Sequence, residues 1–135
     1  MKRFLYYSFD LKSATDRWPL SLKTNLIRTF FGKSVGDCLD AIFSRSIFEV
    51  PFLRSVRGVV FFRVGQPLGF LSSWPLFTLT HHLVMFYCAE KVYPGQRFTR
   101  YAILGDDVCI ADENVASLYR QTVNDLGLAI RKGVR

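Results

Sequence analysis

Cysteine is scarce in this chain, and its distribution excludes two classes of small protein. The sequence has three cysteines, Cys38, Cys88 and Cys109, which is an odd number at wide spacing. A disulfide framework needs cysteines in pairs, and a zinc motif needs two of them a few residues apart. We therefore expect a chain that folds around an apolar core in a reducing compartment, without disulfide bonds or a structural zinc ion.

Charge is absent from one long stretch, residues 64–89, which Arg63 precedes and Glu90 and Lys91 follow. The stretch is long enough to cross a bilayer as a helix. Its composition argues against a membrane span, because it contains prolines, glycines, histidines and several hydroxyl side chains. A loop followed by a buried helix is the better prediction, and no membrane insertion is expected.

Internal repeats and low-complexity linkers are also absent, and the 135 residues suit one domain with a sizeable core. Half of the residues are hydrophobic and 16% are aromatic, which excludes a disordered chain. The net charge of +7 favours a polyanionic partner, either nucleic acid or an anionic membrane surface.

Hydrophobic periodicity and turn residues predict the order of strands and helices. Strands are expected at residues 4–9, 56–64, 100–104, 108–111 and 128–130, and helices at residues 20–31, 37–48, 73–91 and 113–126. Asp112 is expected to cap the last of these helices. This order predicts an α+β fold in which helices pack on one face of an antiparallel sheet.

The tripeptide Gly105-Asp106-Asp107 lies between two of the expected strands and predicts a tight hairpin turn. Such a turn holds two like charges side by side, and divalent cations stabilise a pair of this kind. A third carboxylate would complete a two-metal site for phosphoryl transfer. Taken alone, the tripeptide is weak evidence for such a site and favours an ordinary turn, since Asp and Gly are common turn residues.

Two further carboxylates, Asp10 and Asp16, follow the first expected strand. Asp10 could join Asp106 and Asp107 around two magnesium ions, which prefer carboxylate and phosphate oxygens. Asp16 could accept a hydrogen bond from a sugar hydroxyl of a nucleotide. The alternatives are a solvated aspartate at a strand end and a helix cap.

Three ordered segments, SFDLKSATDRWPL, GQPLGFLSSWPLFTLTHH and YAILGDDVCIAD, resemble motifs A, B and C of the palm of viral RNA-dependent RNA polymerases. The sequences of these motifs are most similar to those of the mitoviruses, which are capsid-less RNA replicons of fungal and plant mitochondria. The resemblance extends over residues 4–130. It implies RNA-templated nucleotidyl transfer with Mg²⁺ or Mn²⁺, an RNA template and ribonucleoside triphosphates.

The resemblance assigns roles to individual residues. Asp10, Asp106 and Asp107 match the catalytic metal ligands, and the resemblance favours Asp106 as the direct motif C ligand. Asp16 matches the motif A carboxylate that senses the ribose 2′-hydroxyl. Lys132 is a candidate general acid of motif D, although its surroundings depart from the family pattern.

Motif B is matched by the loop from Gly65 to Gly69 together with Ser72 and Ser73, which in the family support the template and the nascent base pair. Either serine could take the polar role. Capping of the following helix is the alternative for both, and the two roles could hold at the same time. His81 and His82 are expected on opposite sides of that helix, with one of them packed in the core.

The family's fingers lie mostly before motif A and its thumb after motif D, and the sequence has little room for either. The resemblance therefore implies a single truncated palm, a remnant in a plant mitochondrial genome that is inactive as an isolated mitochondrial protein. Such a fragment would need the missing parts or another partner, and apolar side chains such as Phe30, Phe31, Phe61 and Phe62 are expected to be exposed. The alternative function is a basic mitochondrial protein that binds RNA or a membrane without catalysis.

Overall fold

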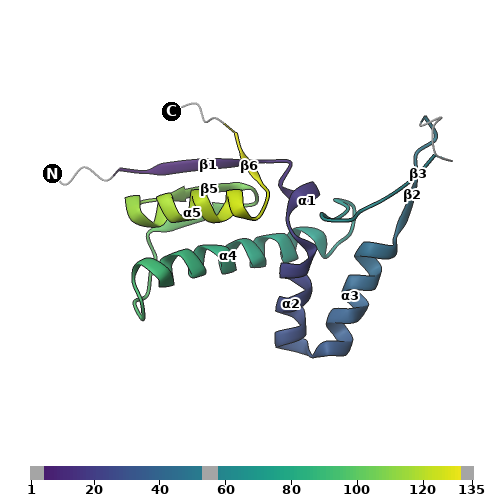
Figure 1. Cartoon of the computed structure of the whole chain (residues 1–135), viewed down its shortest axis with the longest axis horizontal. Coiled ribbons are helices and arrows are strands. Elements are labelled where there is room, and N and C mark those ends of the chain that lie inside the picture. Colours follow the sequence, from purple (N-terminus) through teal and green to yellow (C-terminus); the bar gives the residue numbers. More distant parts are fainter. Residues whose placement is uncertain (1–4, 53–57, 132–135) are drawn as a thin grey trace.

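The computed structural model describes residues 5–52 and 58–131 of the chain. Four strands and two helices form the main body, and the short α1 links it to two further helices and a short hairpin that extend from it (Figure 1). The elements are β1 (Tyr7–Lys12), α1 (Ala14–Arg17), α2 (Leu20–Phe31), α3 (Lys33–Arg45), β2 (Ile47–Glu49), β3 (Val59–Phe61), α4 (Ser73–Val92), β4 (Tyr101–Leu104), β5 (Asp107–Ile110), α5 (Glu113–Asp125) and β6 (Ala129–Ile130).

The main sheet has the strand order β4-β5-β1-β6, and every neighbouring pair in it is antiparallel. Alternate residues of β1 and β5 are buried, among them Phe9, Leu11, Val108 and Ile110. These side chains belong to one core cluster with residues of α4 and α5. Because side chains alternate between the faces of a strand, the two helices cover one face of the sheet. The predicted α+β fold, with helices on one face of an antiparallel sheet, is confirmed.

The helix α4 lies at the centre of this core. Phe77, Val84 and Met85 are buried against the sheet, and Thr80 accepts a 2.8 Å hydrogen bond from the indole nitrogen of the fully buried Trp18. The segment of residues 64–89 is thus a loop followed by a helix, as predicted. Within residues 5–52 and 58–131, no helix has the length and apolar character needed to cross a membrane.

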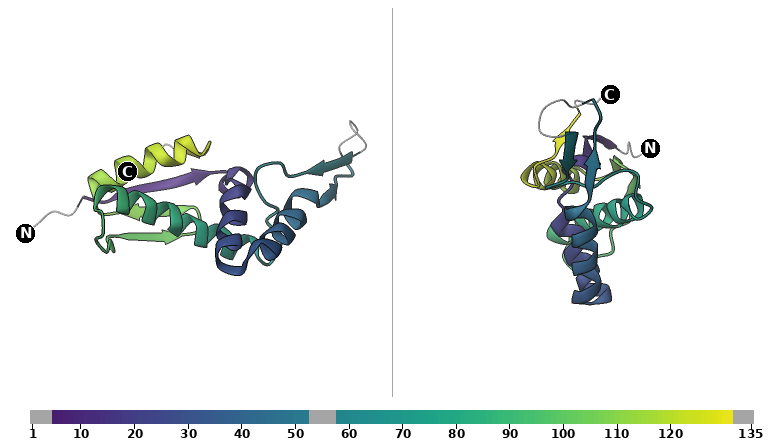
Figure 2. Two further views of the ribbon diagram at one scale, coloured as in Figure 1. Left: turned by 60° about the horizontal axis from the view of Figure 1, so that its bottom comes forward. Right: turned by 90° about the vertical axis from the view of Figure 1, so that its right-hand side faces the viewer.

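The helices α2 and α3 form an antiparallel pair that projects from the body and leads into the β2–β3 hairpin (Figure 2). Arg28 of α2 donates to Asp37 of α3 at 2.7 Å, and Gly36 allows the helices to approach, since a Cβ there would lie 2.2 Å from the Arg28 side chain. Large apolar side chains on these extended parts are exposed, including Phe30, Phe31 and Phe61, as expected. The expectation was wrong for Phe62, which is half-buried because its ring packs against that of Phe48, with the centroids 5.7 Å apart.

Three element predictions were wrong in their bounds. The strand expected at residues 56–64 is limited, within the described residues, to Val59–Phe61, the stretch that pairs with Ile47–Glu49. The helix expected at residues 37–48 begins at Lys33 and ends at Arg45, because Ile47–Glu49 leaves the helix to pair with β3. The strand expected to end at Asp10 instead runs through it to Lys12, because β5 and β6 pair with β1 on both sides. Asp112 caps α5 as predicted, since its carboxylate accepts from the Val115 amide at 3.0 Å.

Candidate active site

Two of the predicted carboxylates, Asp10 and Asp107, lie directly opposite each other across the β1–β5 pairing. The residues that flank them, Phe9 and Val108, point into the core. Directly opposite residues of an antiparallel pair point to the same side, so both carboxylates lie on the face of the sheet that the helices leave open. The sheet therefore brings together one carboxylate from each of two distant segments.

The third carboxylate, Asp106, lies in the turn between β4 and β5, beside Gly105. Its carbonyl oxygen accepts from the Leu11 amide at 3.2 Å, so the turn is tied to β1. Among the residues that the structure describes, no three histidine, cysteine, aspartate or glutamate side chains form a ready group for a metal ion. The donor type and the shared face of Asp10 and Asp107 suit a hard divalent cation, and the complete ligand set stays a prediction.

A shallow cavity of about 630 Å³ covers the open face at this point. Its lining includes Ser8, Asp10, Leu104, Asp107, Cys109 and Arg131. Asp106 does not line it. The two carboxylates thus face a space of the size that small ligands occupy in proteins.

Arg131 is the basic residue of this cavity. It follows β6, and its amide donates to the Asp10 carbonyl at 2.8 Å while its guanidinium contacts the Asp10 carboxylate at 3.2 Å. This contact was not predicted from the sequence, because it depends on the register of β6 against β1. Lys132, the predicted motif D residue, lies outside the described residues.

The turn that carries Asp106 is held from behind by His81 of α4. His81 Nδ1 lies 2.9 Å from the Gly105 carbonyl oxygen, and Nε2 lies 2.6 Å from the Tyr119 hydroxyl. A carbonyl only accepts, so Nδ1 carries the proton and Nε2 accepts from Tyr119. Burial lowers the pKa of His81 to about 4, and the ring is neutral at pH 7.

His82 has a separate environment, in which Nδ1 lies 2.9 Å from the Tyr101 hydroxyl. The prediction that one histidine of the pair is packed in the core is confirmed, and this residue is His81.

Trp74 completes the support of the turn. Gly105 has a φ of +61°, and a Cβ there would lie 2.4 Å from the Trp74 ring. Glycine is thus required twice at this position, by the left-handed backbone and by the close approach of the indole. The first turn of α4 and the hairpin turn therefore pack directly against each other.

The loop after β3 packs against α1, the element that carries Asp16. The Gln66 amide donates to the Thr15 carbonyl at 2.9 Å, and a Cβ on Gly65 would lie 2.2 Å from the Asp16 carbonyl oxygen. Gly69 differs, because nothing lies within 4 Å of a Cβ placed there. Asp16 lies inside α1 and is exposed, so it does not take the alternative role of a helix cap.

The two serines after this loop are now distinguished. Ser73 is buried, and its hydroxyl donates to the Pro67 carbonyl at 2.5 Å, while its own carbonyl accepts from the Gln66 side chain at 2.6 Å. Ser72 is exposed, and its side chain makes no capping bond to α4. Ser72 thus occupies the N-cap position of α4 without a side-chain capping bond, and Ser73 holds the loop together.

Comparison with known proteins gives a consistent result. The family model of the mitovirus RNA-dependent RNA polymerase matches residues 1–133. The chain is 38% identical to the RNA-directed RNA polymerase of Cryphonectria parasitica mitovirus 1 over 128 residues, which is 95% of this chain and 15% of the viral protein.

Two proteins of Arabidopsis thaliana are also similar, and both are named as uncharacterized mitochondrial proteins. One is 48% identical over 92% of this chain, and the other is 41% identical over 91% of it. The chain spans 62% of the length of the first and 50% of the second. It therefore covers less than two thirds of each relative.

Proposed function

The chain belongs to the mitovirus RNA-dependent RNA polymerase family, and from this premise we propose that it is the palm part of such a polymerase. In this proposal the chain is one truncated palm unit, and its carboxylates belong to the centre for RNA-templated nucleotidyl transfer. The observation that carries the proposal is the placement of Asp10 opposite Asp107 on the open face of the sheet.

Asp10, Asp106 and Asp107 would hold Mg²⁺ or Mn²⁺. When bound, these ions stabilise negative charge on the attacking and leaving oxygens in phosphoryl transfer. Asp10 and Asp107 are fixed by strand pairing, and Asp106 by a turn that His81 and Trp74 hold. The fold therefore supplies positioned carboxylates, and positioning contributes much of the rate in this chemistry.

The substrate-binding roles fall on residues around the same end of the sheet. Asp16 is exposed and accepts a hydrogen bond from the ribose 2′-hydroxyl in this proposal, with Gly65 setting its position through the backbone contact. Gly69 and Ser72 are exposed and contact the template or the nascent base pair, whereas Ser73 acts through the loop that it holds. RNA and ribonucleoside triphosphates are the implied partners.

We expect an isolated chain of this sequence to lack measurable polymerase activity. The residues of this chain that match the viral polymerase correspond to only 15% of that protein. Most of the viral surface that would bind triphosphate and product therefore lies outside the matched region. The test is primer extension with a labelled ribonucleotide and Mg²⁺ or Mn²⁺, beside a double variant, Asp106→Ala with Asp107→Ala. Template-dependent extension that the double variant abolishes would contradict the inactivity and support the metal site.

Addition of the other segments of a mitovirus polymerase as a second polypeptide tests the site itself. Restored extension that depends on Asp10 and Asp106 is expected. Restored extension that survives Asp10→Asn would overturn the assignment of the metal ligands.

A second candidate function is RNA binding without catalysis. The net charge of +7 and the contact between Arg131 and Asp10 favour it, because that contact neutralises one carboxylate of the site. This function predicts an affinity that falls steeply with salt and does not change when Mg²⁺ is removed.

A mitochondrial location follows from the same relatives, which are named as mitochondrial proteins. In this proposal the chain is a remnant of a mitovirus-like polymerase in a plant mitochondrial genome. Fractionation of plant mitochondria with an antibody against the chain tests the location. Recovery of the protein only outside mitochondria would contradict it.

A further inference from the structure

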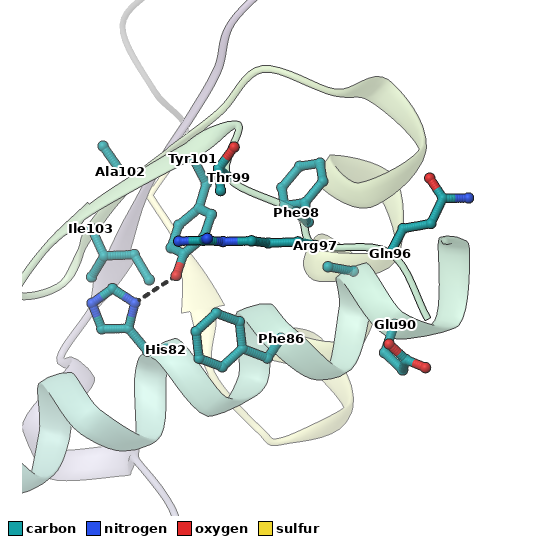
Figure 3. Close-up of a pocket in the computed structure, with 11 residues that line it drawn as sticks. His82, Phe86, Glu90, Gln96, Arg97, Phe98, Thr99, Tyr101, Ala102 and Ile103 are labelled. Carbon is teal, nitrogen blue, oxygen red and sulfur yellow. Dashed lines mark hydrogen bonds between the residues drawn. The ribbon is translucent and has the colours of Figure 1, made fainter. Parts of the chain in front are cut away.

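A second cavity of about 630 Å³ lies on the outer side of the edge strand β4, against the C-terminal half of α4 (Figure 3). The helix contributes His82, Phe86 and Glu90 to its lining, β4 contributes Tyr101, and the segment between them contributes Arg97. No role of the candidate active site uses these side chains.

Aromatic rings form one wall of this cavity. The Phe86 and Tyr101 rings are nearly perpendicular, at 88° with their centroids 6.2 Å apart, and the Tyr101 hydroxyl is fixed by His82 at 2.9 Å. Phe86 is 53% exposed, so the ring that Tyr101 supports on one side remains accessible. A supported and exposed ring of this kind is a platform for a planar ligand.

The segment between α4 and β4 adds a positive charge to the cavity lining. Arg97 is exposed, makes no hydrogen bond or ion pair with any residue that the structure describes, and extends across the cavity toward Tyr101 (Figure 3). The nearby Arg100 is different, because it pairs with Asp112 at 2.8 Å. The Glu90 carboxylate is held by the Gly95 amide, which donates to it at 3.0 Å. Its negative charge repels anions from that part of the lining, so Arg97 is the side chain that can contact a phosphate.

The two cavities meet at β4. Ala102 and Ile103 line both of them, so the surface continues from Asp10 and Asp107 over the edge strand to Phe86. A flexible chain that enters one cavity can therefore reach the other without crossing the helical core.

From these observations we propose that the cavity binds an unpaired ribonucleotide, with its base on Phe86 and its phosphate on Arg97. Aromatic side chains stack on bases without regard to sequence, and arginine adds the phosphate contact. Duplex RNA does not fit this site, because its bases are stacked on each other and unavailable to Phe86. The site does not need a metal ion, so it is independent of the carboxylates.

The test is fluorescence anisotropy of a short labelled single-stranded RNA, measured in EDTA over a range of salt concentrations. Phe86→Leu is expected to weaken binding about fivefold or more, as the loss of one stacked base does. Arg97→Gln is expected to reduce the slope of log affinity against log salt by about 0.7, which corresponds to one phosphate contact on a single strand.

Matched controls remove the same groups elsewhere. Phe31 and Arg45 are exposed residues of α2 and α3 outside the cavity, so Phe31→Leu and Arg45→Gln should leave both values near those of the native chain. Equal losses in the variants and their controls would overturn the proposal, as would native binding by both cavity variants.

Competitors distinguish the source of the nucleotide. Displacement by unlabelled single-stranded RNA but not by a ribonucleoside monophosphate indicates a strand, and equal displacement by both indicates a free nucleotide. Displacement by duplex RNA as efficient as by single strands would contradict an unpaired base. Circular dichroism of each variant checks that the fold is retained.

Discussion

His81 on α4 reaches across the core to the carbonyl oxygen of Gly105, 2.9 Å away, and so joins the central helix to the turn that carries Asp106. The same ring accepts from Tyr119 on α5 and packs near Trp18, whose ring centroid lies 5.2 Å away. One neutral side chain thus links the two covering helices to the predicted catalytic turn. Its polar contacts are buried, so their loss cannot be replaced by water.

Replacement of His81 by leucine is expected to lower the free energy of unfolding by about 2–4 kcal/mol, because it leaves the Gly105 carbonyl and the Tyr119 hydroxyl without partners. His82→Leu is the matched control and should cost about 1 kcal/mol, since it removes one partly buried hydrogen bond. Urea unfolding at pH 7 measures both. A smaller loss for His81→Leu than for His82→Leu would contradict the described network.

The pH dependence of stability should carry the signature of His81. Its folded pKa is about 4 and its ordinary value is 6.5, so the unfolded chain binds the extra proton between these values. The free energy of unfolding therefore rises with pH across this window. When the pH falls from 6.5 to 4, protonation of His81 in the unfolded chain lowers it by about 3 kcal/mol. The measurement is the difference in unfolding free energy between the native chain and His81→Leu. That difference should shrink as the pH falls, and a constant difference would count against the buried neutral ring.

The sequence predicted two of the features around this histidine. The Gly105–Asp106 turn was predictable because a glycine-aspartate pair lies between two apolar runs, and a packed histidine because His81 and His82 must face different ways. Partners that come from distant strands were not predictable. Ile42, Phe43 and Ile47 fit one helical face, so the local pattern gave no sign that residues 47–49 would pair with residues 59–61.

The same limit explains the contact between Arg131 and Asp10. It depends on the register of β6 against β1, in which Leu11 pairs with Ile130. Register is a property of the assembled sheet, and a two-residue strand specifies it weakly from sequence. The sequence also could not separate Ser72 from Ser73, because their difference arises from the fold of the loop before them.

Gly65 and Gly69 should respond differently to alanine. At Gly65 the new Cβ would lie 2.2 Å from the Asp16 carbonyl oxygen, which belongs to the backbone and cannot yield easily. Gly65→Ala should therefore lower stability by about 1–3 kcal/mol. Gly69→Ala meets nothing within 4 Å and should leave stability unchanged or raise it slightly. Thermal unfolding of the two variants measures these changes in stability. Equal changes would show that the loop does not pack against α1.

Lys23 on α2 is fully buried, and its amino group has no hydrogen-bond partner among the described residues. Burial lowers the pKa of Lys23 from 10.5 to about 7. The unfolded chain thus binds more protons between pH 7 and 10.5, and this group makes stability rise with pH in that window.

Lys23→Met keeps the apolar stem and removes the amine, so it should raise stability by about 1–4 kcal/mol at pH 7 and by less at pH 10. The exposed Lys12→Met is the control, with little change expected. Urea unfolding at the two pH values measures the gain, and a loss of stability on Lys23→Met would show that the amine has a stabilising partner.

Arg131 should compete with divalent cations for Asp10, if Asp10 is a metal ligand as proposed. The guanidinium lies 3.2 Å from the Asp10 carboxylate, and both side chains are partly exposed, so the contact is weak and can be displaced. Arg131→Gln should tighten Mn²⁺ binding about two- to fivefold, which corresponds to the loss of one exposed ion pair. The measurement is titration of the chain with Mn²⁺, with free Mn²⁺ followed by electron paramagnetic resonance.

Arg45→Gln changes the net charge equally at a remote site, so its small effect on Mn²⁺ affinity sets the baseline. Asp10→Asn should weaken Mn²⁺ binding strongly. If Arg131→Gln binds Mn²⁺ no more tightly than Arg45→Gln does, Asp10 and Arg131 do not share the site in the way that the structure implies.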